Sequence, residues 1–317
     1  MKKAIVVGHT GQDGTYLSRL LTEKQYAVTG ISGRAFSSDI PLDIKKINIE
    51  EFKEVERVVK AVQPEEIYYL AAVHQSSADK PVGEGELFQK SINVNVKSFV
   101  NFLEASRIHA PRTKIFYAAS SHIFGNVQAS PQDETTPLNP NCIYGITKTT
   151  GMRAARYYRE NHSLFASVGI FYNHESPLRE SKYVSKKIVE TAAAIKRGVK
   201  SELVLGNLES KIDWGYAPDY MKAVHAMLQL DTPDEFIISS GKIHSIQDFV
   251  SGVFARLGLD WKKYVKVDPS LITKKQKQNL FGNNQKIKKA AGWSPGVGFD
   301  ELIAILVTAE TEKQGAK

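Results

Sequence analysis

The sequence has a single cysteine, Cys142, among its 317 residues. One thiol cannot form an internal disulfide, and it cannot supply the several thiolates of a cysteine-based zinc site. We therefore expect neither a disulfide framework nor a bound metal. The simplest role for Cys142 is that of a small packing side chain.

Long apolar runs are also absent, and none approaches the roughly 18 residues that a membrane-spanning helix needs. The amino terminus, MKKAIVVGHTGQDG, has a basic start but an apolar stretch of only four residues. A signal peptide needs about 7–15 apolar residues. The segment instead predicts a first β-strand, and we expect a cytoplasmic protein that does not bind a membrane.

Lysine and arginine number 42 against 34 aspartates and glutamates, which gives a formal net charge of +8. This charge suits an anionic partner. Nucleic-acid binding would favour a clustered basic stripe with interleaved aromatic residues. The basic runs are instead scattered, so we expect phosphorylated small molecules rather than nucleic acid; the densest runs are Lys45-Lys46, Lys186-Lys187, Lys274-Lys275 and Lys286–Lys289.

The first half of the chain alternates short β-branched runs with helical patterns, which is typical of a parallel sheet with crossover helices. The early strands are apolar on both faces, so helices should cover both sides. We predict strands at Lys3–Val7, Ala27–Ile31, Lys45–Ile49, Glu66–Ala71, Lys114–Ala118 and Ala166–Phe171, and helices at Thr15–Glu23, Phe52–Val62, Ile92–Ser106 and Tyr144–Asn161.

The rhythm changes after about Asn173, where the pattern predicts a smaller mixed lobe. The expected fold class is α/β, a doubly wound parallel sheet of the Rossmann type with this lobe at its carboxyl end. We assign residues 1–173 to a cofactor domain, to which 213–240 return, and most of 174–317 to a substrate-binding lobe. Its predicted elements are helices Lys182–Arg197, Tyr220–Leu230, Ile246–Arg256 and Gly298–Glu312, and strands Ser201–Leu205 and Glu235–Ser239.

A glycine-rich turn between the first strand and the first helix is the strongest local signal. Gly8, Gly11 and Gly14 recur at three-residue spacing. Such glycines permit a tight turn and let backbone amides approach a pyrophosphate, while the helix amino terminus adds partial positive charge. The turn predicts dinucleotide binding through Gly8, Thr10, Gly11, Gln12, Asp13 and Gly14.

The end of the second strand indicates which dinucleotide binds. An acidic residue there would accept the ribose 2′-hydroxyl of NAD. The segment Gly30-Ile31-Ser32-Gly33-Arg34 has no carboxylate and one guanidinium. Arg34 can pair with the 2′-phosphate of NADP, which favours NADP, although Arg34 is alternatively an ordinary surface arginine.

Tyr144 and Lys148 indicate a proton-transfer site. Their spacing places both on one face of a helix, where the lysine cation would stabilise the phenolate and bring its proton exchange nearer neutral pH. Upstream, Ser120 and Ser121 follow the fifth strand, where a hydroxyl can hydrogen-bond the same substrate oxygen. Together with the glycine turn, this set predicts hydride-transfer chemistry.

The chain resembles the GDP-mannose 4,6-dehydratases, within the extended short-chain dehydrogenases, nearly from end to end. The resemblance extends to blocks more specific than the general fold motifs, above all Asn-His-Glu-Ser-Pro at 173–177. The other blocks are Gly8–Tyr16, Val62–Tyr68, Leu205–Leu208, Asp213–Gly215 and Asp219-Tyr220.

The resemblance implies roles for individual residues. Tyr144 and Ser120 would activate the C4 hydroxyl of the sugar. The adenine half of NADP would lie on Gly8–Asp13 and Arg34, and the nicotinamide half on Lys148, His174 and Arg179. His174 is alternatively a core histidine, and Arg179 an ion pair between lobes. Further expected cofactor contacts are Asn48, Ile49, Leu70, Ala71 and Ala72, and expected substrate contacts are Ser121, Asn173, Lys211, Lys274 and Lys275.

The clearest departure from the family is His122. The dehydratases have Thr-Ser-Glu where this chain has Ser120-Ser121-His122, and in the family that carboxylate removes the C5 proton and assists loss of water. An imidazole, with an ordinary pKa near 6.5, can accept and return a proton. In GDP-fucose synthase a cysteine occupies the equivalent position. His122 is therefore predicted as the acid–base group, or it only lines the pocket.

Two further departures affect specificity and assembly. The family's Arg-Pro-x-Glu element, which grips the nucleotide ribose, reads Lys274-Lys275-Gln276-Lys277 here. Lys274 or Lys275 could still hold phosphate. Relatives are dimers or tetramers, and a homo-oligomer is expected here as well, but the loop at 35–40 that helps to bridge subunits is short, which disfavours a tetramer.

Three functions are compatible with these residues. The first is an NADP-dependent 4,6-dehydratase of a nucleotide sugar, such as a GDP-hexose, with His122 in place of glutamate. The second is a 4-keto-sugar reductase or epimerase, which needs no elimination. The third, a catalytically silent NADP-binding regulator, is disfavoured because Tyr144 and Lys148 are both present.

Overall fold

The β-branched runs of the first half form the strands of a mostly parallel sheet. The computed structural model describes residues 1–33, 35–42, 44, 46–75, 82–272 and 279–315. Within these residues the sheet has seven strands in the order β11-β6-β5-β4-β1-β2-β3, all parallel except β3, which runs antiparallel to β2. Their bounds are β1 Lys3–Val7, β2 Ala27–Ile31, β3 Phe36–Ser38, β4 Glu66–Tyr69, β5 Lys114–Ser120, β6 Ala166–Phe171 and β11 Glu235–Ile238.

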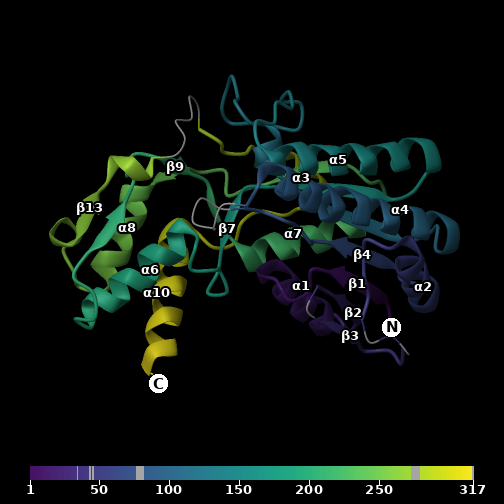
Figure 1. Ribbon diagram of the computed structural model, residues 1–317, viewed down its shortest axis with the longest axis horizontal. Helices are drawn as coiled ribbons and strands as arrows, with labels where there is room; N and C mark the ends of the chain where they lie inside the picture. The colour runs from purple at the N-terminus through teal and green to yellow at the C-terminus, as the bar shows by residue number, and fades with distance from the viewer. Residues whose placement is uncertain (34, 43, 45, 76–81, 273–278, 316–317) are drawn as a thin grey trace.

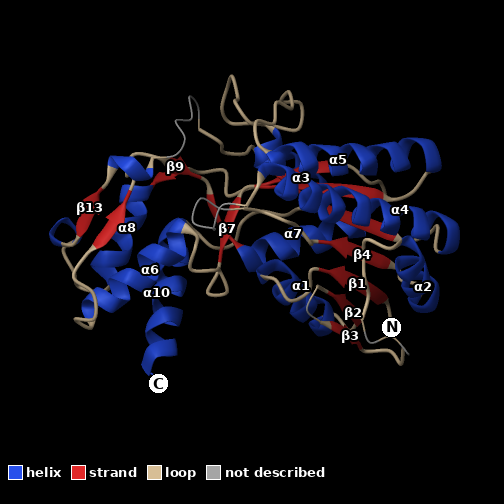
Figure 2. Ribbon diagram, viewed as in Figure 1, coloured by secondary structure: helices blue, strands red, loops and turns tan. Residues whose placement is uncertain are grey.

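The strands are apolar on both faces because each face is covered by helices. Along β1, Ile5 and Val7 join one core cluster while Ala4 and Val6 join the other, as the two-residue period of a strand requires. Figure 2 shows the strands lying between two helical layers. One layer contains α2 Phe52–Val62, α4 Ser98–His109 and α5 Ile143–His162, and the other contains α1 Gln12–Glu23 and α7 Ala217–Gln229.

The smaller lobe has its own apolar core and lies beside the sheet, with the carboxyl terminus on it (Figure 1). A buried ion pair of 2.9 Å between Lys186 Nζ and Glu310 Oε2 ties two of its helices together. The lobe contains α6 Val184–Lys196, α8 Ile246–Arg256, α10 Phe299–Gly315 and the strand pairs β8 Leu203–Leu205 with β13 Val265–Val267 and β9 Lys211–Ile212 with β12 His244–Ser245.

The chain crosses between the two parts more than once. After β6 it forms β7 Asn173–Glu175, which pairs with β10 Trp214–Tyr216. It then returns to the sheet, where α7 packs against α1, β11 pairs with β6 and α9 Gln285–Ala291 packs on α7. The doubly wound fold class is thereby confirmed, while the division of cofactor and substrate binding between the parts stays a prediction.

The expected third strand at Lys45–Ile49 is wrong over its described residues 46–49, which form no strand. Ile47 is buried and Ile49 is partly buried against the core, so both are apolar because they pack. The sheet edge is instead occupied by β3, inside the segment 35–40 that was expected to be a loop. A short apolar run does not distinguish a strand from a packed turn.

The predicted helix Ile92–Ser106 is also longer and less regular than expected. Helix α3 Glu84–Ile92 precedes it, and a π-helical turn at Asn93–Lys97 joins α3 to α4. No helix among the described residues is long and apolar enough to cross a membrane.

Helix α5 packs on β5 with Gly151 directly against the Tyr117 side chain. A Cβ at Gly151 would lie 2.1 Å from the Tyr117 hydroxyl oxygen. The same buried ring lies 4.9 Å from Lys148 Nζ, and its hydroxyl donates to the Asn95 carbonyl at 2.8 Å. The Tyr117 ring therefore contacts both Gly151 and Lys148, and it helps to position the Lys148 ammonium group.

We predict that G151A destabilises the protein by about 1–3 kcal/mol, because the added methyl overpacks a filled site. It should also weaken activity by displacing the Tyr117 ring beneath Lys148. Urea unfolding measures the first effect. The matched control is G85A in α3, where a Cβ meets no atom within 4 Å; equal destabilisation by both substitutions would contradict the packing argument.

Candidate active site

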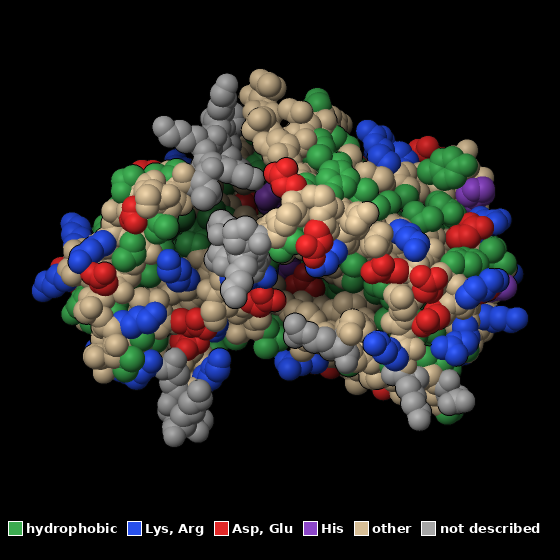
Figure 3. Space-filling view, in the orientation of Figure 1, with side chains coloured by type: hydrophobic (Ala, Val, Ile, Leu, Met, Phe, Trp, Pro, Cys, Tyr) green, Lys and Arg blue, Asp and Glu red, His purple; other side chains and the backbone are tan. Residues whose placement is uncertain are grey.

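A cavity of about 1260 Å³ opens at the carboxyl ends of the parallel strands. Ligands of open α/β sheets bind at this edge. The lining includes Gly8 after β1, Ala71 after β4, Ser120 at the end of β5 and Asn173 after β6. Figure 3 shows the surface hollowed between the two parts, with Lys and Arg side chains scattered over this face.

The glycine turn forms one wall of this cavity. Gly8 has a φ of +93°, and a Cβ there would lie 2.8 Å from the Ala71 backbone nitrogen. A Cβ on Gly14 would lie 2.2 Å from the Gly8 carbonyl oxygen. Helix α1 therefore begins close against the turn. Its N-cap, Gly11, supplies no side-chain cap, so first-turn amides are available to an anion.

A carboxylate–imidazole pair links α1 to β7. His174 Nε2 lies 3.0 Å from both carboxylate oxygens of Asp13, and His174 Nδ1 lies 2.8 Å from the Tyr172 carbonyl oxygen. Burial alone would raise the pKa of Asp13, but the charge and hydrogen bond of His174 lower it below its ordinary value. Burial disfavours the His174 cation, yet Asp13 raises the pKa of His174.

Neighbouring groups extend this link. Ser176 Oγ donates to Gln12 Oε1 at 2.7 Å, and Gln12 Nε2 donates to the His174 carbonyl at 3.2 Å. Arg179 lies with Nε 3.2 Å from Glu175 Oε2, and its guanidinium stacks 3.6 Å from the Tyr183 ring centroid. The buried Arg179 Nε makes no well-aligned hydrogen bond within the protein, which suits a group that also reaches a bound ligand.

Tyr144 and Lys148 lie on one face of α5, as predicted. Lys148 is 1% exposed, and its Nζ donates to the Ala118 carbonyl at 2.7 Å and lies 5.6 Å from the Tyr144 ring centroid. Burial lowers the pKa of Lys148 to about 7, although the charge of Asp13 acts in the opposite direction.

The expected lowering of the Tyr144 pKa does not occur in the protein alone. Burial, with smaller contributions from Tyr183 and Asp13, raises the pKa of Tyr144 above its ordinary value. The reason is that Tyr144 and Lys148 are both withdrawn from water, which disfavours the charged form of each. Tyr144 is therefore a phenol, and Lys148 can gain or lose a proton near neutral pH.

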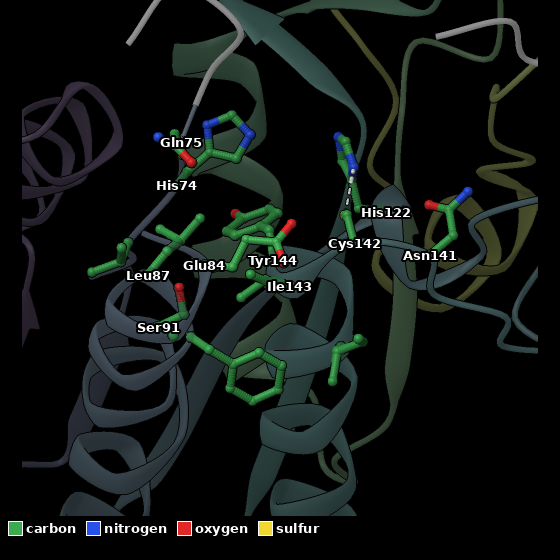
Figure 4. Close-up of a pocket in the computed structure, with 14 residues that line it drawn as sticks. His74, Gln75, Glu84, Leu87, Ser91, His122, Asn141, Cys142, Ile143 and Tyr144 are labelled. Atoms are coloured by element: carbon green, nitrogen blue, oxygen red, sulfur yellow. Dashed lines mark hydrogen bonds between the residues drawn. The ribbon is translucent and has the colours of Figure 1, made fainter. Parts of the chain in front are cut away.

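His122 and His74 lie beside Tyr144. The ring centroid of Tyr144 lies 4.7 Å from that of His74 and 5.8 Å from that of His122. His122 Nδ1 is 3.7 Å from Cys142 Sγ, and the Tyr183 hydroxyl is 3.3 Å from His74 Nδ1. Figure 4 shows the two imidazoles on opposite sides of the open space next to Tyr144.

Most of the predicted site residues meet in this one cavity. The glycine turn, the strand ends and the catalytic set contribute Gly8, Thr10, Gly11, Asp13, Asn48, Ile49, Leu70, Ala71, Ala72, Ser120, Ser121, His122, Tyr144, Lys148, Asn173, His174 and Arg179 to its lining. Gln12 and Gly14 lie behind this wall, where they hold the turn in place. The roles assigned to these residues stay predictions.

A few predicted residues lie elsewhere. Arg34, Lys274 and Lys275 are outside the described residues. Lys211 lies on β9, paired with β12 in the smaller lobe, and does not line the cavity.

Sequence reasoning missed several lining residues, among them His74, Tyr183 and Lys46. His74 follows β4 by five residues, so its place beyond a strand end was the signal that could have identified it. Tyr183 directly precedes α6 and comes from the other part of the chain, a proximity that no local pattern reveals.

A model of the GDP-mannose 4,6 dehydratase family matches residues 5–306. The chain belongs to this family. It is 34% identical to GDP-mannose 4,6 dehydratase 2 of Arabidopsis thaliana, over 98% of this chain and 87% of the relative. It is 32% identical to the Homo sapiens GDP-mannose 4,6 dehydratase, over 98% and 91%. The resemblance inferred from the motifs is thus confirmed.

Solved structures confirm the fold. The structure of RMD from Pseudomonas aeruginosa complexed with NADPH superposes with a TM-score of 0.84 at 16% identity, covering 99% of this chain and 100% of the other. A dTDP-glucose 4,6-dehydratase from Bacillus anthracis, in complex with NAD, gives 0.82 at 18% identity, covering 99% and 98%. Because it belongs to the GDP-mannose 4,6 dehydratase family, the chain is an enzyme of the extended short-chain dehydrogenase type.

We predict that D13N lowers the free energy of unfolding by about 1.5–3 kcal/mol near pH 5.5, where the pair is fully charged. The contribution of His174, whose folded pKa is raised, is complete below about pH 6.5 and disappears as pH rises through that pKa. The contribution of Asp13 is complete above about pH 4 and disappears as pH falls.

Urea unfolding at pH 5.5 and pH 8.5 measures this difference, which should be smaller at pH 8.5. D231N, at an exposed position, is the matched control. A D13N effect that is equal at both values would show that His174 does not carry the charge.

Proposed function

We propose that this protein is an NADP-dependent 4,6-dehydratase of a nucleotide-activated hexose, most favourably a GDP-hexose. One observation carries the proposal: Ser120, His122, Tyr144 and Lys148 line the same cavity as the glycine turn of α1. Membership of the GDP-mannose 4,6-dehydratase family supports the substrate class.

The residues present fit a nicotinamide dinucleotide. The absence of a Cβ at Gly8 and the uncapped start of α1 leave backbone amides for the pyrophosphate. Asn48 and Ile49 would flank the adenine, and Lys148, His174 and Arg179 the nicotinamide half. When bound, such a cofactor supplies hydride exchange with C4 and then C6 of the hexose.

The protein's own groups would move the protons. With the cofactor bound, its charge would favour the phenolate of Tyr144, which would then take the proton of the C4 hydroxyl, with Ser120 hydrogen-bonded to the same oxygen. Lys148, whose pKa is lowered to about 7, would adjust the charge beside Tyr144 as the proton moves. General acid–base catalysis is most efficient when the catalytic pKa lies near the working pH.

His122 would remove the proton at C5. Its backbone N–H donates to Ser120 Oγ at 3.3 Å. His122 therefore lies next to the hydroxyl that would bind the C4 oxygen of the sugar. Because His122 stands where the family has a glutamate, a second candidate function is a 4-keto-sugar reductase or epimerase. Such an enzyme uses the same hydride chemistry and needs no elimination.

Incubation with GDP-, UDP-, CDP- and dTDP-hexoses, without added NADPH, tests the proposal. We expect a 4-keto-6-deoxy product from a GDP-hexose such as GDP-mannose. H122N should lose this product yet still exchange hydride at C4, whereas Y144F should lose both. NADPH consumption with 4-keto sugars and no elimination would support the reductase instead, and unchanged turnover by H122N would refute its role.

The preference for NADP rests on the absence of a carboxylate in Gly30–Arg34. We predict that R34A weakens NADP binding by about 10-fold or more while NAD binding changes little, because a charge-assisted pair with the 2′-phosphate is lost. Calorimetric titration with both cofactors measures the ratio, and R112A, at an exposed arginine, is the control. An unchanged ratio would overturn the assignment.

A further inference from the structure

His74, His122 and Tyr144 form a triangle of rings that the proposed function uses only in part. The centroid distances are 4.7 Å for His74–Tyr144, 5.8 Å for His122–Tyr144 and 6.1 Å for His74–His122. In Figure 4 the two imidazoles flank the space beside Tyr144, one from the segment after β4 and the other from the end of β5.

Loss of water from neighbouring carbons needs two proton transfers. A base must take the proton from C5, and an acid must protonate the C6 hydroxyl so that it leaves as water. One carboxylate can alternate between these tasks. Here two imidazoles lie beside Tyr144, so each can carry out one of the two transfers.

We propose that His74 is a catalytic residue, the general acid that protonates the departing C6 hydroxyl from Nε2, while His122 takes and returns the C5 proton. This inference rests on the proposed dehydratase function. The family's glutamate would thus be replaced by two imidazoles on different strand ends.

The surroundings of His74 suit this task. Its Nδ1 faces the Tyr183 hydroxyl at 3.3 Å, which can donate to a neutral ring and accept from a cationic one. Tyr183 is itself held by the Arg179 guanidinium, 3.6 Å from its ring centroid. The imidazole is therefore held in place in either protonation state.

The protons balance with His74 as the acid and His122 as the base. In each turnover Tyr144, as the phenolate that the bound cofactor would favour, gains the proton of the C4 hydroxyl. His74, as the imidazolium, loses one to the departing hydroxyl, and His122 returns to C5 the proton that it took. The net change in the sugar is loss of one water. The resting state is restored when Tyr144 releases this proton and His74, the imidazole nearer to it, regains one through solvent.

A second cavity gives the departing water a place to go. It has a volume of about 710 Å³ and is lined by His74, His122 and Tyr144 together with polar groups of α3, including Glu84 and Ser91. Water leaving C6 would enter this space without passing the glycine turn that would hold the cofactor.

A substrate whose leaving group needs no proton tests the assignment. Fluoride departs without general acid, so GDP-6-deoxy-6-fluoromannose needs only the base. For H74N we expect turnover of GDP-mannose to fall about 10²–10⁴-fold while fluoride release stays within about threefold of wild type. H122N should lose both reactions, because each requires removal of the C5 proton.

Further variants separate a chemical role from a structural one. H162N, on an exposed histidine at the end of α5, is the matched control and should turn over both substrates like wild type. Calorimetry should show GDP-mannose binding to H74N with wild-type affinity. Y183F should lower water elimination and spare fluoride release, as H74N does, though by a smaller factor.

Three outcomes would overturn the inference. Equal loss of both reactions in H74N would make His74 structural, and retention of both would make it dispensable. Loss of fluoride release in H74N with its retention in H122N would reverse the roles. Wild-type protein that eliminates neither water nor fluoride would instead overturn the proposed function, which distinguishes the two failures.

Discussion

The contact between Asp13 and His174 holds the two halves of the cleft in register. Asp13 lies in the first turn of α1, directly after the glycine turn, and His174 lies on β7, where the chain leaves the sheet for the smaller lobe. Burial makes an unpaired charge costly at this place, so the pair stabilises the cleft only while both partners are present. The glycine turn lies on one side of this link and β7 on the other.

Withdrawal from water is the second constraint on the site. Lys148 is buried against the Ala118 carbonyl and the Tyr117 ring, and its pKa moves to about 7. Burial raises the pKa of Tyr144 at the same time. A charge bound beside these two buried groups would shift their proton equilibria strongly, because the local dielectric constant is low.

The proposed function places a histidine, His122, where the resemblance to the family implies a glutamate. A carboxylate and an imidazole both accept a proton, but they differ in size, charge and hydrogen-bond geometry. Here His122 contacts the Cys142 thiol, and His74 lies across Tyr144 from it. The thiol that looked like simple packing in the sequence thus touches the proposed acid–base group.

Much of the fold followed from local patterns. The strands Lys3–Val7, Ala27–Ile31 and Ala166–Phe171 have the predicted bounds because β-branched runs, glycines and neighbouring helical periods agree there. The expected strand at Lys45–Ile49 failed because Ile47 and Ile49 are apolar for packing and not for pairing. An edge strand such as β3 forms because the neighbouring strand β2 has unpaired backbone groups. A short stretch of sequence does not show which backbone groups remain unpaired.

The sequence by itself determined the glycine turn, the spacing of Tyr144 and Lys148 and the presence of His122, because each is a local pattern along one element. Only the tertiary structure decided that His74 and Tyr183 join them, since these residues come from separate segments that meet across the cleft. It also decided the direction of the Tyr144 pKa, because burial depends on every element packed around the ring.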